Sequence, residues 1–72
     1  MEFEITGRSV RVLRLKQVLE KIGIARSTVY DRLNPTSARY DPHFPRPIRL
    51  GGNAVGWFEK ELDLWLSLRN RT

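Results

Sequence analysis

The chain has 72 residues, a formal net charge of +5, one histidine and no cysteine. This length allows a single small domain, and the lack of cysteine excludes disulfides and thiolate metal sites. With His43 as the only histidine, we expect no metal and no cofactor. No apolar run is long enough to cross a bilayer, and the acidic start at residues 1–4 is unlike a signal peptide. We therefore expect a cytoplasmic protein without a membrane partner.

The positive charge is concentrated in one part of the sequence. Residues 8–56 contain ten basic and three acidic side chains, so this stretch carries +7. Residues 1–7 contribute −2, and residues 57–72 are neutral, with three charges of each sign. Ten of the thirteen basic residues are arginines, whose planar fork suits phosphates and guanine edges. The pattern favours a nucleic-acid partner over the alternative of a solvated basic surface.

The N-terminal half of the sequence predicts an arm, a strand and two helices. Residues 1–9 are expected to form a mobile arm, and the alternation in residues 10–14 indicates a short edge strand. Four apolar side chains recur at the spacing i, i+3, i+4, i+7 and predict a helix at Lys16–Ile22; they are Leu15, Val18, Leu19 and Ile22. Gly23 supplies a left-handed residue at its end. A second helix is predicted at Arg26–Leu33, ended by the Asn-Pro pair that follows.

The C-terminal half predicts a loop, a hairpin and a last helix. All four prolines lie in residues 34–47, which therefore form a loop, held to the core by Tyr40 and Phe44. Strands at 48–50 and 55–57 flank a glycine-rich turn, and residues 58–69 return to a helical pattern. This order predicts a small winged helix-turn-helix over residues 10–72. It is an α+β, mostly helical fold with three helices and a two-stranded β-hairpin wing.

The periodic apolar positions define the predicted core, which is modest in size. Its members are Leu15, Val18, Leu19, Ile22, Val29, Leu33, Ile48, Val55, Phe58, Leu62, Trp65 and Leu66. Trp57 lies in the same apolar segment as Trp65, so we interpret both tryptophans as core side chains rather than as stacking platforms for bases.

Several segments together resemble the AlpA family of phage and prophage regulators, over about residues 10–69. The segments are Val12–Val18, Gly23–Tyr30, Phe44–Gly52 and Val55–Trp57. The resemblance implies a MerR-like or excisionase-like winged helix that binds DNA. Such proteins activate a prophage integrase gene or act as directionality factors in excision. In two departures from the family, Ala25 replaces a frequent serine cap, which leaves capping to Ser27 or water, and the proline-rich loop is longer than in the shortest relatives.

The second helix carries the predicted base-reading residues. A helix in the major groove reads bases mainly through its N-terminal half. Three residues are therefore expected near base edges, namely Arg26, Ser27 and Thr28, with Arg26 placed to contact guanine. Tyr30 and Arg32 flank this face and are expected to contact phosphates. For Tyr30, partial burial against the loop prolines is an equal alternative.

The hairpin is the second predicted contact with DNA. Arg46 and Arg49 flank its turn, and Gly52 and Asn53 occupy its tip. A tip poor in side chains lets backbone amides approach a phosphate, or lets an arginine enter the adjacent minor groove. We favour the phosphate contact and expect these four residues to contact the DNA. The alternative is that the tip is only a tight turn.

Two roles stay open for Asp31 in the second helix. Its carboxylate could accept a hydrogen bond from a cytosine amino group, or it could pair with an arginine.

These predictions together indicate a sequence-specific regulator of transcription that binds double-stranded DNA, of phage or prophage type, and not an enzyme. A second role as an excision directionality factor is left open. Because so small a domain makes few contacts, specificity is expected to need self-association on DNA or a partner recombinase or regulator. The alternative is a protein-interaction module that inhibits or recruits another regulator through an apolar face at Leu64 and Leu68.

Overall fold

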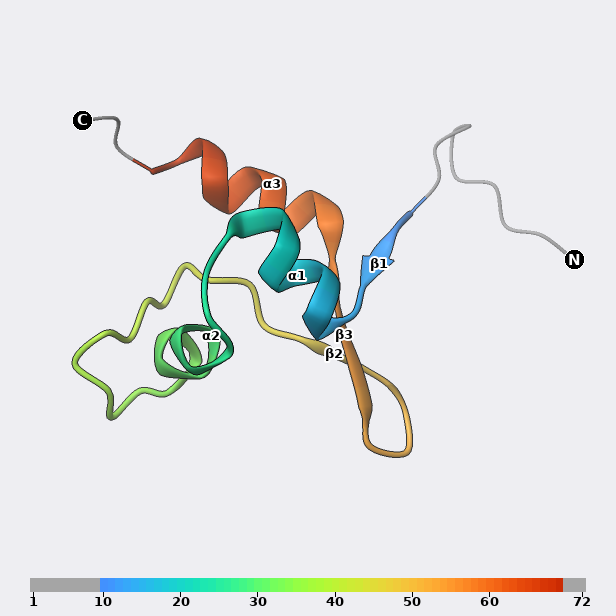
Figure 1. Cartoon of the computed structure of the whole chain (residues 1–72), viewed down its shortest axis with the longest axis horizontal. Coiled ribbons are helices and arrows are strands. Elements are labelled where there is room, and N and C mark those ends of the chain that lie inside the picture. Colours follow the sequence, from blue (N-terminus) through green and yellow to red (C-terminus); the bar gives the residue numbers. More distant parts are fainter. Residues whose placement is uncertain (1–9, 70–72) are drawn as a thin grey trace, which may run out of the picture.

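The computed structural model describes residues 10–69, so the arm predicted for residues 1–9 lies outside the described residues. In chain order the elements are β1 (Val12–Leu13), α1 (Leu15–Ile22), α2 (Arg26–Leu33), β2 (Ile48–Gly51), β3 (Ala54–Phe58) and α3 (Glu59–Ser67) (Figure 1). The predicted order of helix, helix, hairpin and helix is confirmed, and α2 has the predicted bounds. The ends of the other elements lie within two residues of their predicted positions.

The sheet has three antiparallel strands in the order β1-β3-β2, so β3 is its middle strand. β2 and β3 form the predicted wing hairpin, in which Arg49 pairs with Val55. The register shifts between Arg49 and Gly51, just before the turn. β1 pairs with the base of the hairpin, with Val12 opposite Phe58. The fold is therefore a winged helix-turn-helix whose sheet is one strand wider than the wing alone.

Gly56 lies where β1 and β2 both approach the middle strand. A Cβ atom at this position would stand 2.5 Å from Val12 Cγ1, 3.1 Å from the carbonyl oxygen of Leu13 and 3.1 Å from Leu50 Cδ1. Ordinary contacts between carbon atoms are about 3.5–4.0 Å. Only glycine therefore lets β1 lie this close to the hairpin.

The turn between α1 and α2 begins with the left-handed glycine that the sequence predicts. Gly23 has φ 70° and donates its N–H to the carbonyl of Leu19 at 2.8 Å, which ends α1 in the left-handed conformation. α2 begins after Ala25, whose methyl group offers no side-chain cap. The first hydrogen bonds of α2 instead run from backbone amides to the Ala25 carbonyl, for example from Thr28 at 3.0 Å.

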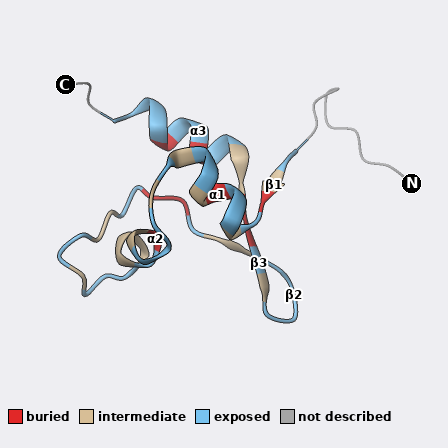
Figure 2. Ribbon diagram, in the orientation of Figure 1, coloured by how far each residue is buried: buried red, intermediate tan, exposed pale blue. Residues whose placement is uncertain are grey.

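Within residues 10–69, seven hydrophobic side chains form the buried core, and they come from β1, α1, α2, the loop, β3 and α3 (Figure 2). They are Leu13, Val18, Val29, Phe44, Trp57, Leu62 and Trp65. Of the remaining predicted core positions, four pack around this cluster as half-buried residues: Leu15, Leu19, Ile22 and Leu33. Ile48 and Phe58 are half-buried as well. Most of the predicted core is thus confirmed, including both tryptophans.

Two predicted core residues are wrong. Val55 is 38% exposed, because the part of β3 next to the turn extends past β1, which pairs only with Trp57 and Phe58. Leu66 is 37% exposed, because α3 buries only a narrow stripe made of Leu62 and Trp65.

The loop at residues 34–47 is tied to the core at its C-terminal end. The rings of Phe44 and Trp65 meet edge to face, with centroids 4.9 Å apart and an interplanar angle of 82°. Trp57 Nε1 donates to the carbonyl of Pro45 at 3.1 Å, and Trp65 Nε1 donates to Asp41 Oδ2 at 2.9 Å. These contacts confirm that Phe44 anchors the loop, and both indole N–H groups find loop oxygens as partners.

Asp41 keeps its charge although it is largely buried. Burial alone would raise the pKa of this carboxyl, but hydrogen bonds from Trp65 and from the backbone N–H of His43, together with the nearby charge of Arg32, hold the pKa below its usual value. Arg69 Nη1 lies 3.5 Å from Asp41 Oδ2. The carboxylate therefore joins the loop, α2 and the end of α3.

Candidate nucleic-acid interface

The N-terminal half of α2 faces outward while its middle is held by the core. Val29 is fully buried and fixes the helix to the rest of the domain. Arg26 and Ser27 are exposed, and Thr28 is half-buried. The three residues predicted to read base edges therefore share the first turn of α2, with the two most N-terminal ones open to solvent.

Tyr30 and Arg32, which flank the predicted base-reading face of α2, lie in different surroundings. Tyr30 is 53% exposed, so about half of it is open to solvent, and its contact with a phosphate stays a prediction. Arg32 is half-buried, and its Cζ lies 5.8 Å from the centroid of the Trp65 ring. The carbonyl of Arg32 also accepts from the N–H of Asp41 at 3.0 Å. Arg32 thus supports the packing of α2 against α3 and the loop, and its contact with a phosphate stays a prediction.

The predicted residues of the wing are all on the surface. Arg46 is exposed just before β2, and Arg49 is exposed in β2 itself. Gly52 and Asn53 form the exposed turn, where Gly52 has φ 52°. A left-handed residue at the tip brings the backbone of the hairpin around without a side chain. The tip is therefore a tight turn whose backbone is exposed and shielded by few side chains.

The two predicted contact elements lie on the same side of the domain relative to α3. In Figure 1, α3 lies above α1, while α2 and the tip of the hairpin lie below it. α2 is seen almost end-on, and the hairpin projects away from the helices.

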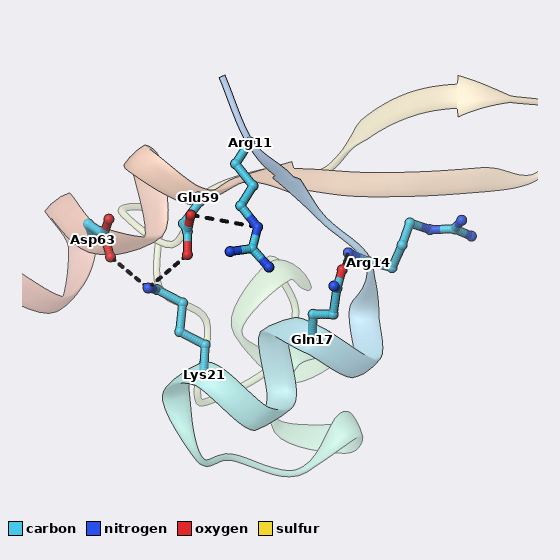
Figure 3. A network of polar contacts seen from close by, with 6 residues as sticks. All are labelled: Arg11, Arg14, Gln17, Lys21, Glu59 and Asp63. Atoms are coloured by element: carbon cyan, nitrogen blue, oxygen red, sulfur yellow. Dashed lines mark hydrogen bonds and ion pairs between the residues drawn. The ribbon is translucent and has the colours of Figure 1, made fainter. Parts of the chain in front are cut away.

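Two of the three acidic residues of α3, Glu59 and Asp63, form ion pairs with basic side chains. Lys21 Nζ lies 3.1 Å from Glu59 Oε2 and 3.0 Å from Asp63 Oδ1, and Arg11 Nε lies 3.9 Å from Glu59 Oε1 (Figure 3). The hydrogen bonds that Lys21 donates to Asp63 and Glu59 raise the pKa of Lys21. These contacts join α1 and Arg11, the residue before β1, to α3 and offset the negative charge there.

The arginines of the predicted interface are not engaged in this way. Within residues 10–69, Arg26, Arg46 and Arg49 form no ion pair with a carboxylate. The same part of the chain contains no helix long and apolar enough to span a bilayer and no group of His, Cys, Asp or Glu suited to a metal ion. The unneutralised arginines are thus the chemical feature that marks this surface.

Sequence reasoning missed Arg14 as part of this region. Arg14 is exposed, and its Nε donates to the carbonyl of Val55 in the wing at 3.0 Å, across 41 positions of the chain. In the sequence it is only one of several basic residues near α1. The contact depends on the pairing of β1 with β3, which brings Arg14 alongside the hairpin near its turn.

Comparisons with known proteins agree with the resemblance. The sequence model of the family described as "Prophage CP4-57 regulatory protein (AlpA)" matches residues 11–70. The chain is 56% identical over 61 residues to "DNA-binding transcriptional activator AlpA" of Escherichia coli (strain K12), a match that covers 85% of this chain and 87% of the relative. It is 32% identical over 59 residues to "Uncharacterized protein ORF88" of Enterobacteria phage P4, covering 82% of this chain and 60% of that protein.

No solved structure matches the chain. The family model nevertheless spans all six secondary-structure elements, from β1 to α3. Both the segments that suggested the resemblance and the complete fold fall within the matched residues. The chain belongs to the AlpA family of prophage regulatory proteins.

Proposed function

We propose that this protein is a sequence-specific transcriptional regulator that binds double-stranded DNA. The observation that carries the proposal is the first turn of α2, where Arg26 and Ser27 are exposed while the buried Val29 holds the helix in place. This is the arrangement that a recognition helix needs to reach base edges in the major groove. The relative from Escherichia coli, which is 56% identical, is named as a DNA-binding transcriptional activator, and this supports the proposal.

In this proposal α2 reads bases and the hairpin contacts the backbone. Arg26 forms a bidentate contact with guanine, and Ser27 and Thr28 contact neighbouring bases. The remaining residues position the protein through phosphates: Tyr30, Arg32, Arg46, Arg49, Gly52 and Asn53. Neutralising phosphates releases counterions, so binding weakens with salt.

The setting of the proposed activity follows from this mode of binding. A regulator of prophage genes acts on DNA in the bacterial cytoplasm, and binding of this kind requires no catalysis. Because the domain is small, we propose that specificity depends on several copies on repeated sites or on a partner recombinase or regulator. Footprinting on DNA that contains an integrase promoter and an attachment site separates regulation of transcription from a role in excision.

The test begins with selection of a binding site from a library of random duplexes. Affinity for the selected duplex and for a random duplex is then measured at several salt concentrations for the parent and two variants. Arg26→Ala should weaken binding to the selected site by about 1–3 kcal/mol and change random binding far less. Arg49→Ala should weaken both duplexes alike, because a phosphate contact carries no sequence information.

A matched control is Arg39→Ala, which removes the same charge from the exposed part of the loop. Its effect measures the contribution of net charge alone. Equal losses on both duplexes with Arg26→Ala would remove this residue from base reading. If the parent protein enriched no sequence and bound no duplex at low salt, the proposed function would be refuted.

A protein-interaction module is the second candidate function. The observation that favours it is the outer face of α3, where Leu64 is 61% and Leu68 is 68% exposed. The double variant Leu64→Asp, Leu68→Asp separates the two candidates. If interaction with a regulator is the main activity, partner capture is lost while the isolated domain still binds DNA as the parent does.

A further inference from the structure

Arg14 occupies the place where β3 loses its neighbour on one side. β1 pairs with β3 in a register that, if continued, would place Leu15 opposite Val55. Leu15 is already the first residue of α1, so the chain leaves the sheet before its backbone can donate to the Val55 carbonyl. The side chain of Arg14 takes over this role, with Nε 3.0 Å from the carbonyl oxygen. The part of the wing next to its turn is thus held by a side chain, beyond the point where β1 ends.

The main chain of Arg14 is fixed as well. Its N–H donates to Gln17 Oε1 at 2.8 Å, and its carbonyl accepts from the N–H of Val18 at 3.0 Å. A side chain that is already ordered loses less conformational entropy when it binds a ligand. Arg14 is therefore pre-organised at its backbone and at Nε.

The outer end of the guanidinium is available for a ligand. A guanidinium carries five N–H donors in a rigid fork, and the Val55 carbonyl uses only the one on Nε. Within residues 10–69, Arg14 forms no ion pair with a carboxylate. Figure 3 shows its guanidinium directed away from the cluster of Lys21, Glu59 and Asp63. Two parallel N–H donors of this kind match the oxygens of a phosphate.

We propose that Arg14 binds a backbone phosphate of DNA while it holds the part of the wing next to its turn. The proposal rests on the proposed function, because it assumes that α2 and the hairpin engage the same duplex. In helix-turn-helix proteins the first helix crosses the DNA backbone, and Arg14 immediately precedes α1. One side chain thereby sets the position of the hairpin and supplies a contact between the segments bound by α2 and by the wing.

The experiment uses two substitutions of Arg14 and a matched control. Arg14→Gln removes the charge, Arg14→Lys keeps the charge without the fork, and Arg39→Gln removes a charge from an exposed arginine in the loop. The probe is a short, fluorescently labelled duplex of random sequence, titrated at several NaCl concentrations. Random sequence is sufficient because a phosphate contact does not depend on the bases.

The salt dependence of affinity is the decisive readout. Arg14→Gln should reduce the slope of log K against log [NaCl] by about 0.9, the contribution of one phosphate, whereas Arg39→Gln should leave the slope unchanged. Arg14→Lys should keep the slope but bind about fivefold more weakly, the effect of losing one typical hydrogen bond. In the absence of DNA, both Arg14 variants should also shift the NMR resonance of the Val55 carbonyl carbon.

Equal slopes for Arg14→Gln and Arg39→Gln would overturn the phosphate contact. An Arg14→Lys variant that binds as tightly as the parent would overturn the role of the fork. If Arg14→Gln is unfolded at the assay temperature, Arg14→Lys is compared with Arg39→Lys, and equal affinities would overturn the proposal. A parent protein that binds no duplex refutes the proposed function itself, whereas binding by the parent with unchanged Arg14 variants refutes only this inference.

Discussion

Replacement of Trp65 by alanine is the most direct test of the fold. Only 6% of Trp65 is exposed. A buried tryptophan removes about 150–250 Å² from water, which at about 25 cal/mol per Å² corresponds to about 4–6 kcal/mol. A domain of this size without disulfides has a free energy of unfolding of roughly 3–5 kcal/mol. The expected result is therefore that Trp65→Ala is unfolded at room temperature.

A milder substitution separates the polar contact of Trp65 from its packing. Trp65→Phe keeps an aromatic ring next to Phe44 and under the guanidinium of Arg69, whose Cζ lies 4.7 Å from the Trp65 ring centroid. It removes the N–H donor to the carboxylate of Asp41. A hydrogen bond to a charged group contributes about 1.5–3 kcal/mol. We expect Trp65→Phe to lower the free energy of unfolding by about this amount and to retain a cooperative transition.

Both substitutions are measured by circular dichroism during thermal and urea unfolding. Leu68→Ala is the control, because Leu68 is 68% exposed at the C-cap of the same helix and its truncation should change stability by no more than about 0.5 kcal/mol. A Trp65→Ala protein that kept the thermal midpoint of the parent would refute the assignment of Trp65 to the core, whatever the result for the control.

Three further predictions concern positions with defined geometry. Gly56→Ala should lower stability by about 1–3 kcal/mol, because the new methyl group meets backbone as well as side chains; an unchanged urea midpoint would show that β1 does not lie against the hairpin. Gly23→Ala should cost about 1–2 kcal/mol in the same assay, since its φ of 70° disfavours a Cβ atom, and a neutral effect would contradict the left-handed cap. The pKa of Asp41 is lower in the folded state than its ordinary value of 3.8, so its stabilising contribution is present above that pH and is lost as pH falls through the folded-state pKa. Asp41→Asn should flatten the pH dependence of the melting temperature in acid, and an unaltered profile would count against this role.

The helices were predictable because their signals are local. The bounds of α2 followed from the turn at Gly23 and the Asn-Pro pair after Leu33, both of which act within a few residues. The hairpin followed from its glycine-rich turn. The pairing of β1 with β3 was beyond reach, because a strand of two residues carries almost no alternating pattern and its partner lies more than 40 residues away.

The errors in the core have the same origin. Val55 is apolar and alternates correctly, but its burial depends on how far β1 extends along β3, and β1 ends too early. Leu13 is buried by long-range packing that no periodicity reports, whereas Phe44 was predicted to hold the loop to the core and is itself part of the core. At the candidate interface, helical geometry placed Arg26 and Ser27 on the surface correctly, whereas the packing of Arg32 against Trp65 could not be anticipated from spacing within one helix.

The loop anchored at Asp41, Phe44 and Pro45 offers a practical position for a reporter group. Ala38, in the N-terminal half of the loop, is exposed, and the chain has no cysteine of its own. An Ala38→Cys variant therefore provides one thiol for a fluorophore or spin label on a segment that is fixed to the core but belongs to neither the helices nor the hairpin. A probe at that position would follow the tumbling and assembly of the whole domain on a duplex without altering the residues proposed to bind it.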